Sequence, residues 1–153
     1  RPRSAAITLA LIGPGAVICE IQQNSDTTYR LYDYGRGRQL HLADGLAISH
    51  LHRWQPQPAP QVIDASDAVW TRLVTAAYFA TDLGLLNADA PCHLQPAGAY
   101  RLLVILEGTG LISGQPYTAG ECWLIDAAEP AVRIEPAAGT RVLRTGPPSP
   151  LLS

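Results

Sequence analysis

The stretch "LEGTGLISGQPYTAGECWLI", residues 106–125, alternates short apolar runs with residues that favour turns. Glycines at 108 and 110 interrupt the first apolar run, and Ser113-Gly114 predicts a tight turn between two strands. Ala119-Gly120 then precedes a further apolar run. Short strands at this spacing are typical of an antiparallel jelly roll, in which the packing or closure of the sheets protects strand edges. The stretch therefore predicts an all-β fold.

The rest of the chain supports the same fold class. It contains 13 Gly and 13 Pro among 153 residues, and only 16% of its residues are charged. Such a composition favours short strands joined by turns over long amphipathic helices. One short helix is expected within residues 40–51. Further strand-like runs are predicted at 72–83, 100–113, 120–127, 131–136 and 140–146.

A proline-spaced segment, "QPQPAPQ" at residues 55–61, predicts an extended connector, because each proline fixes its own φ and restricts the preceding residue. The sequence thus indicates a first lobe at 1–54 and a second lobe at 62–153. The chain starts at Arg1 and contains no methionine. We therefore interpret it as a piece of a longer polypeptide.

Charge and cysteine content exclude several classes of partner. The 11 basic and 13 acidic residues are scattered and give a net charge of −2, so neither nucleic acid nor a membrane is expected as a partner. The apolar runs are shorter than the roughly 20 residues of a spanning helix. Three widely spaced cysteines without a C-x-x-C motif predict a reduced, cytoplasmic setting. Cys122, beside Trp123, is expected to pack in the core.

A polar segment near the start, "EIQQNSDTTYRLYDYGRGR" at residues 20–38, predicts a hairpin with strands at 16–23 and 27–34. A three-residue loop at 24–26 would place Glu20 opposite Arg30 and Gln22 opposite Thr28 on one polar face. This face could be solvated, as is common in antiparallel sheets, or it could line a binding site. Periodicity alone leaves both interpretations open.

The strings "TLALIGPG" (8–15) and "EIQQNSDTTYR" (20–30), followed by "RQLHL", closely resemble the signature of type I mannose-6-phosphate isomerases, the zinc-dependent cupin enzymes, in their short bacterial form. The match is most specific over residues 12–42. The resemblance implies an RmlC-like cupin, an antiparallel jelly-roll barrel. The chain would then contribute a partial first lobe, made of the last strands of the catalytic barrel, and a complete second lobe.

The same resemblance implies interconversion of mannose 6-phosphate and fructose 6-phosphate through an enediol, with zinc polarising the sugar oxygens. By position, Arg30 matches the family's active-site arginine, whose fixed charge can stabilise an enediolate or hold the phosphate. Glu20, Gln22 and Thr28 are the expected substrate-binding residues. The implied partners are a sugar phosphate and the missing N-terminal portion of the barrel.

One position departs from the family pattern. The family has a histidine zinc ligand two residues before its Ile-Gly-Pro-Gly turn, and here that position is Ala10. The other zinc ligands of the family precede this stretch, so the chain is expected to lack the zinc site and to be inactive alone. "HLH" at 50–52 has no following acid, and His41 is expected either to be structural or to support a neighbouring site residue. A non-catalytic sugar-phosphate-binding or regulatory cupin and a structural assembly lobe remain alternatives.

Overall fold

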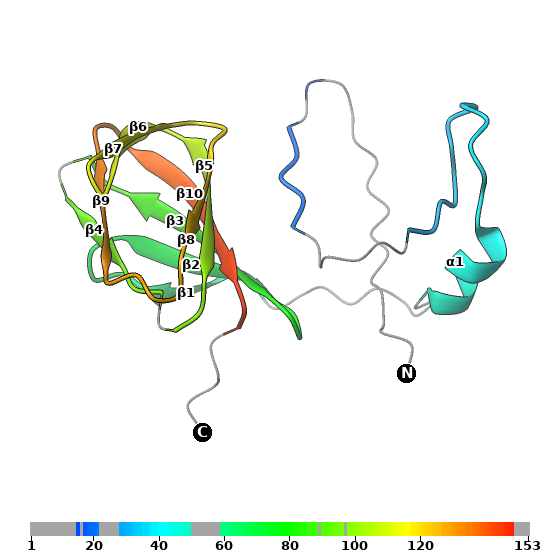
Figure 1. Ribbon diagram of the computed structural model, residues 1–153, viewed down its shortest axis with the longest axis horizontal. Helices are drawn as coiled ribbons and strands as arrows, with labels where there is room; N and C mark the ends of the chain where they lie inside the picture. Colours follow the sequence, from blue (N-terminus) through cyan, green and yellow to red (C-terminus); the bar gives the residue numbers. More distant parts are fainter. Residues whose placement is uncertain are drawn as a thin grey trace. The chain divides into compact units, whose positions relative to one another are not determined.

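The computed structural model describes residues 15, 17–21, 28–49, 59–88, 90–96 and 98–148 (Figure 1). The chain divides into two compact units, residues 1–56 and 57–153, which we describe separately. The boundaries of the lobes and their assignment to a cupin enzyme stay predictions. Within the described residues, no helix has the length and apolar character needed to cross a membrane.

The part of the first unit that the structure describes contains one short helix, α1 (Leu42–Ile48), as expected from the sequence. Its buried Gly45 is packed so closely on Leu31 that an added Cβ would lie 2.4 Å from Leu31 Cδ2. Ser49 ends the helix, with its Oγ donating to the carbonyl of Gly45 at 2.6 Å. The helix thus packs against the preceding loop at Gly45, and a larger residue there would require the Leu31 side chain to shift.

The strands expected at 16–23 and 27–34 are not found in the parts of this segment that the structure describes. Residues 17–21 and 28–34 form no strand, and residues 22–27 lie outside the described ranges. The backbone of Arg30 instead pairs with His41, and its guanidinium lies beside Asp33. Local contacts with residues 33–41 thus replace the predicted pairing with residue 20.

The described residues of the second unit form ten antiparallel strands in two sheets, and Figure 1 shows how these strands are arranged. The larger sheet has the order β1-β2-β3-β10-β5-β8, and the smaller has the order β4-β9-β6-β7. The larger sheet comprises β1 (Gln61–Asp64), β2 (Val69–Thr75), β3 (Ala80–Leu86), β10 (Thr140–Gly146), β5 (Arg101–Glu107) and β8 (Cys122–Ile125). The smaller comprises β4 (Cys92–Leu94), β9 (Val132–Pro136), β6 (Thr109–Ile112) and β7 (Gln115–Thr118).

The prediction of an antiparallel all-β fold is confirmed in this unit, although the two sheets stay separate and do not close into one barrel. The turn predicted at Ser113-Gly114 joins β6 and β7. Both residues have positive φ, 48° and 80°, as a tight two-residue hairpin turn requires. The run expected at 72–83 is in fact a hairpin, because the chain reverses between β2 and β3 with the amide of Ala76 bonded to the carbonyl of Phe79 at 2.8 Å.

The core of the second unit lies between the two sheets and follows the alternation of side chains along each strand. In β5, Arg101, Leu103 and Ile105 are buried, whereas the residues between them are partly exposed. The cluster includes Trp70, Leu86, Leu103, Ile105, Val142, Cys92, Leu94, Ile112, Tyr117 and Ile134. Each sheet contributes one apolar face, so the core has the arrangement of a β-sandwich.

The cysteines differ in their surroundings. Cys92 is fully buried, and burial raises the pKa of its thiol to about 12, which makes the thiol unreactive at neutral pH. Cys122 is exposed, so its predicted place in the core is wrong. The neighbouring Trp123 packs against the core instead, because successive side chains of β8 point to opposite faces.

Candidate functional sites

Arg30 and His41 form the centre of the polar segment in the first unit. The amide of His41 donates to the carbonyl of Arg30 at 2.8 Å, and the amide of Arg30 donates to His41 Nδ1 at 3.1 Å. Since Nδ1 accepts this bond, the imidazole carries its proton on Nε2. Tyr29 packs on the edge of the same ring, with centroids 6.2 Å apart. His41 is thus tied to Arg30 by two hydrogen bonds, and its role stays a prediction.

The guanidinium of Arg30 is held by two neighbours. Its Nη1 donates to the carbonyl of Gln39 at 3.3 Å, and its Nε lies 3.7 Å from Asp33 Oδ1. The side chain of Arg30 is 29% exposed, so part of it remains accessible to a ligand. An arginine in this setting is oriented before any anion arrives.

Asp33 organises the signature loop, which we define as residues 33–38. The amide of Arg38 donates to Asp33 Oδ2 at 2.7 Å, and the Nε of Arg38 is bonded to Oδ1. Burial alone would raise the pKa of Asp33, but the hydrogen bonds from Arg38 and the charges of Arg38 and Arg30 hold that pKa below its usual value. The loop turns through positive φ at Tyr34, Gly35 and Gly37. A single buried carboxylate thus fixes two arginines of this segment.

Of the other predicted site residues, the structure describes Glu20 and Thr28. Glu20 and Thr28 are exposed, and within the described segments no hydrogen bond or ion pair joins Glu20 to Arg30. Gln22 and Ala10 lie outside the described residues, as do His50 and His52. The substrate-binding roles of Glu20, Gln22 and Thr28 stay predictions.

The described residues offer no metal site that fits zinc. Nowhere in the described ranges do three His, Cys, Asp or Glu side chains come together as possible ligands. His41 uses Nδ1 to accept the Arg30 amide, and His93 lies beside Asp67, with Nδ1 3.7 Å from Oδ2. We therefore derive no chemical step through a metal held by these side chains.

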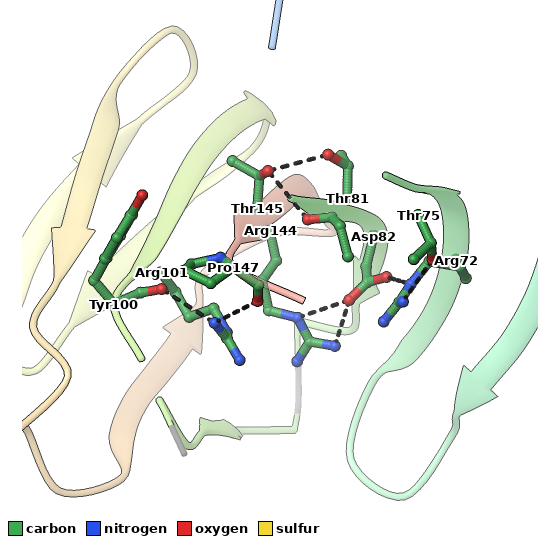
Figure 2. A network of polar contacts seen from close by, with 10 residues as sticks. Arg72, Thr75, Thr81, Asp82, Tyr100, Arg101, Arg144, Thr145 and Pro147 are labelled. Carbon is green, nitrogen blue, oxygen red and sulfur yellow. Dashed lines mark hydrogen bonds and ion pairs between the residues drawn. The ribbon is translucent and has the colours of Figure 1, made fainter. Parts of the chain in front are cut away.

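A second polar cluster lies in the second unit, and the sequence analysis did not identify it (Figure 2). Register places Arg72 on β2 beside Asp82 on β3, and Asp82 beside Arg144 on β10. The Nε of Arg72 is bonded to Asp82 Oδ1, while Nε and Nη2 of Arg144 donate to Oδ2 at 3.1 and 2.8 Å. The buried carboxylate therefore bridges two arginines across three strands.

Two further residues, Trp70 and Arg101, lie next to this cluster. Arg144 stacks on Trp70, with its guanidinium carbon 4.1 Å from the ring centroid, a favourable cation–π distance. Arg101 on β5 is buried, and its Nη1 donates to the carbonyls of Tyr100 and Pro147 at 3.1 and 3.2 Å. We call Arg72, Asp82, Arg101 and Arg144, with the cavity that they line, the arginine pocket.

The arginine pocket encloses a cavity of about 130 Å³ that is partly open to solvent. Its lining is completed by Ala80, Gln95, Thr145, Gly146 and Pro147. The pattern of any single strand could not reveal it, since each of the four strands reads as an ordinary strand with one or two charged positions. The available signal was charge at inward positions of β2, β3, β5 and β10, and using it requires knowledge of which strands are neighbours.

Comparisons of the amino-acid sequence with those of known proteins show which proteins the chain resembles. Over 128 residues, 77% of this chain, it is 33% identical to mannose-6-phosphate isomerase ManA of Bacillus subtilis, and the match covers 40% of that protein. The mannose-6-phosphate isomerase of Streptococcus mutans is 30% identical over 112 residues, which are 69% of this chain and 34% of that protein. The chain is similar to mannose-6-phosphate isomerases.

The chain spans less than half of the length of these relatives. No protein-family model matches the sequence. The crystal structure of mannose 6-phosphate isomerase from B. subtilis superposes on 80% of this chain and 40% of that one, with a TM-score of 0.64 and 22% identity. Ectoine synthase from P. lautus superposes on 57% of this chain and 69% of that one, with a TM-score of 0.51 and 20% identity. The cupin jelly-roll fold predicted from the sequence is thereby confirmed.

Proposed function

We propose that this chain is part of a type I mannose-6-phosphate isomerase, in which it supplies the end of the catalytic cupin lobe and the whole second lobe. The similarity to named mannose-6-phosphate isomerases over 77% of the chain carries this proposal. The reaction would interconvert mannose 6-phosphate and fructose 6-phosphate by moving a proton between C1 and C2 through an enediol.

In this proposal Arg30 is the catalytic residue of the chain. Its guanidinium is permanently charged, and the contacts with Asp33 and the carbonyl of Gln39 fix its orientation. A positioned positive charge of this kind stabilises a developing enediolate or holds the phosphate of the substrate. Glu20, Gln22 and Thr28 are proposed to contact the sugar.

Apolar side chains in the first unit support the proposed partner, the N-terminal portion of the catalytic barrel. The described residues of this unit that expose large hydrophobic side chains are Val17, Ile18, Tyr32, Tyr34, Leu40, Leu42 and Leu46. Val17 is 99% exposed. A barrel completed by further strands would bury such side chains and would also supply the zinc ligands that the described residues do not provide.

The proposal is tested by titrating the chain with mannose 6-phosphate, with and without zinc, by calorimetry. We expect Arg30→Gln to weaken binding at this site at least tenfold, because a charge-assisted contact to the phosphate or sugar oxygens is lost. Arg36→Gln is the matched control, since Arg36 lies in the same segment but stacks on Tyr34, 5.9 Å from its ring centroid. Equal binding by both variants would argue against a substrate role for Arg30.

The titration also separates this function from its alternatives. With the N-terminal portion of the barrel present, zinc-dependent binding favours the isomerase, zinc-independent binding favours a non-catalytic sugar-phosphate-binding or regulatory cupin, and absence of binding favours a structural lobe. The 153-residue chain alone is expected to show no isomerase activity with added zinc. Zinc-dependent turnover by the chain alone would contradict the proposal that residues elsewhere complete the site.

A further inference from the structure

His41 connects Arg30 to the helix of the first unit. Between Arg30 and His41 the chain runs out to the signature loop and returns beside itself, and His41 is the residue at which α1 begins (Figure 1). The amide of Gly45 donates to the carbonyl of His41 at 2.9 Å, as expected for an N-cap residue. His41 therefore contacts α1 through its carbonyl and Arg30 through its amide and its ring.

The side chain of His41 is not used by its own helix. A polar side chain at the N-cap position commonly accepts a hydrogen bond from an amide in the first turn, but His41 makes no such bond. Its Nδ1 accepts the amide of Arg30 instead, at 3.1 Å. The imidazole thus fixes the backbone of Arg30 and not the end of the helix.

Packing of α1 holds the two partners together. A Cβ added at Gly45 would lie 2.4 Å from Leu31 Cδ2 and 3.6 Å from Tyr29 Cβ, so the helix lies against the residues on both sides of Arg30. The ring of Tyr29 meets the imidazole edge-on, at an interplanar angle of 64°. The backbone of Arg30 is therefore held between the ring of His41 and the first turns of α1.

Nδ1 can accept the Arg30 amide only while the imidazole is neutral. A protonated imidazole carries a proton on both nitrogens and has no acceptor left. Histidine is the side chain that most commonly changes charge between about pH 5 and pH 8. The hydrogen bond is therefore present while the ring is neutral and is lost when acidification protonates it.

The other ionisable groups around His41 do not supply a substitute for this bond. These groups are Tyr29 and Arg30 before the signature loop, Asp33 and Arg38 within it, and Asp44 in the first turn of α1. Within the described ranges, no ion pair joins His41 to either carboxylate, and Asp33 is paired with Arg30 and Arg38. The pKa of Asp33 is lowered, so Asp33 stays ionised while the imidazole changes charge.

We propose that His41 is a positioning residue for Arg30, and that ligand binding at Arg30 requires the neutral imidazole. Asp33 and the carbonyl of Gln39 orient the guanidinium, and His41 fixes the backbone from which the side chain extends. Loss of the backbone contact would let the guanidinium leave the position that its ligand needs. The role rests on the proposed function, since Arg30 must contact the substrate for its position to matter.

The hydrogen bond itself is measured in the full chain by the amide proton of Arg30, in an NMR titration from about pH 8 to about pH 5. This proton should shift upfield on acidification, because the amide loses its acceptor. His41→Asn keeps an acceptor bonded to Cγ, has no titratable group, and preserves a favoured N-cap residue. Its Arg30 amide should stay downfield throughout. An Arg30 amide that does not respond to pH in the unmodified chain would overturn the proposal.

Affinity for mannose 6-phosphate is the second measurement, by calorimetry with the N-terminal portion of the barrel present. At about pH 8, His41→Ala should bind about fivefold more weakly than the unmodified protein, the effect of one lost hydrogen bond, and His41→Asn should bind within about twofold. At about pH 5.5 the unmodified protein should bind about fivefold more weakly than His41→Asn. Comparing variants at one pH cancels the titration of the phosphate group, whose second pKa is about 6.

His93→Ala is the matched control, since His93 is exposed in the second unit and lies beside Asp67. It should change neither the Arg30 amide nor the affinity at either pH. A purely structural His41 would give a different result. His41→Ala would then lower the free energy of unfolding, while the affinity of the folded protein and its pH dependence stayed the same, and the positioning role would be wrong.

Arg30→Gln separates the positioning role from the proposed function. If Arg30→Gln weakens binding of mannose 6-phosphate and His41→Ala does not, the positioning role fails while the proposed function stands. If mannose 6-phosphate binds Arg30→Gln as tightly as the unmodified protein, the substrate role of Arg30 fails, and the positioning role fails with it even where the Arg30 amide responds to pH.

Discussion

Asp33 shows, at the scale of one residue, how a single side chain can define a loop. It is buried, and it accepts hydrogen bonds from the backbone and the side chain of Arg38. The sequence predicted that this segment is polar and that Arg30 has an acidic neighbour. That neighbour was predicted to be Glu20, across a hairpin, but the guanidinium lies beside Asp33 because the described backbone of this segment forms a loop and not paired strands.

The protonation of Asp33 should control the signature loop. Its pKa is lowered, so its contribution to stability is present above the ordinary pKa of aspartate and is lost as pH falls through the lower, folded-state value. We expect the amide proton of Arg38, which donates to Asp33 Oδ2, to shift upfield only at pH values below the normal aspartate range. A proton NMR titration measures this. Asp33→Asn should abolish the transition, and a midpoint in the normal range would contradict the prediction.

At the scale of strands, the elements predicted correctly from the sequence are those bounded by glycine, proline or other turn residues. The hairpin at Ser113-Gly114 and the strand at 140–146 were predicted correctly, because alternation and turn signals agree there. The reversal between β2 and β3 was not predicted, since Ala76–Phe79 contains no typical turn residue. The three-residue strand β4 was also missed, because so short a run carries no measurable period.

Gly84 on β3 is a position where the packing of neighbouring strands determines the residue. A Cβ added there would lie 2.6 Å from Trp70 Cζ3 and 2.8 Å from Cη2. Glycine usually weakens a strand, so alanine would be neutral or favourable if there were room. We expect Gly84→Ala to reduce the free energy of unfolding by about 1–3 kcal/mol through overpacking.

Denaturant unfolding monitored by circular dichroism measures the effect of Gly84→Ala. Gly139→Ala is the matched control, because a Cβ at that position meets no atom within 4 Å. It should change stability by less than about 0.5 kcal/mol. Equal stability of the two variants would show that Trp70 can move aside without cost.

At the scale of the whole molecule, the two units differ in what they bury. Every residue of the hydrophobic core lies between Ala68 and Val142, within the second unit. In the first unit, the described residues that are buried are Asp33 and Gly45, neither of which contributes a large apolar side chain. The hydrophobic effect therefore stabilises the second unit far more than the described part of the first.

We accordingly expect residues 57–153 to fold without residues 1–56. A fragment with these bounds should unfold cooperatively on heating, with a midpoint within a few degrees of that of the full chain, as followed by circular dichroism. The complementary fragment, residues 1–56, serves as the comparison and should show no cooperative transition. Loss of cooperativity in the 57–153 fragment would mean that the first unit contributes to the core.

The contact between Trp70 and Arg144 has an optical consequence. Indole fluorescence responds to nearby charge, and a guanidinium 4.1 Å from the ring centroid is close enough to influence it. The chain has three tryptophans, so replacing Trp54 and Trp123 with phenylalanine would leave Trp70 as the sole indole emitter. Any event that redistributes charge around Arg144 would then change the emission of an intrinsic fluorophore, without an attached dye.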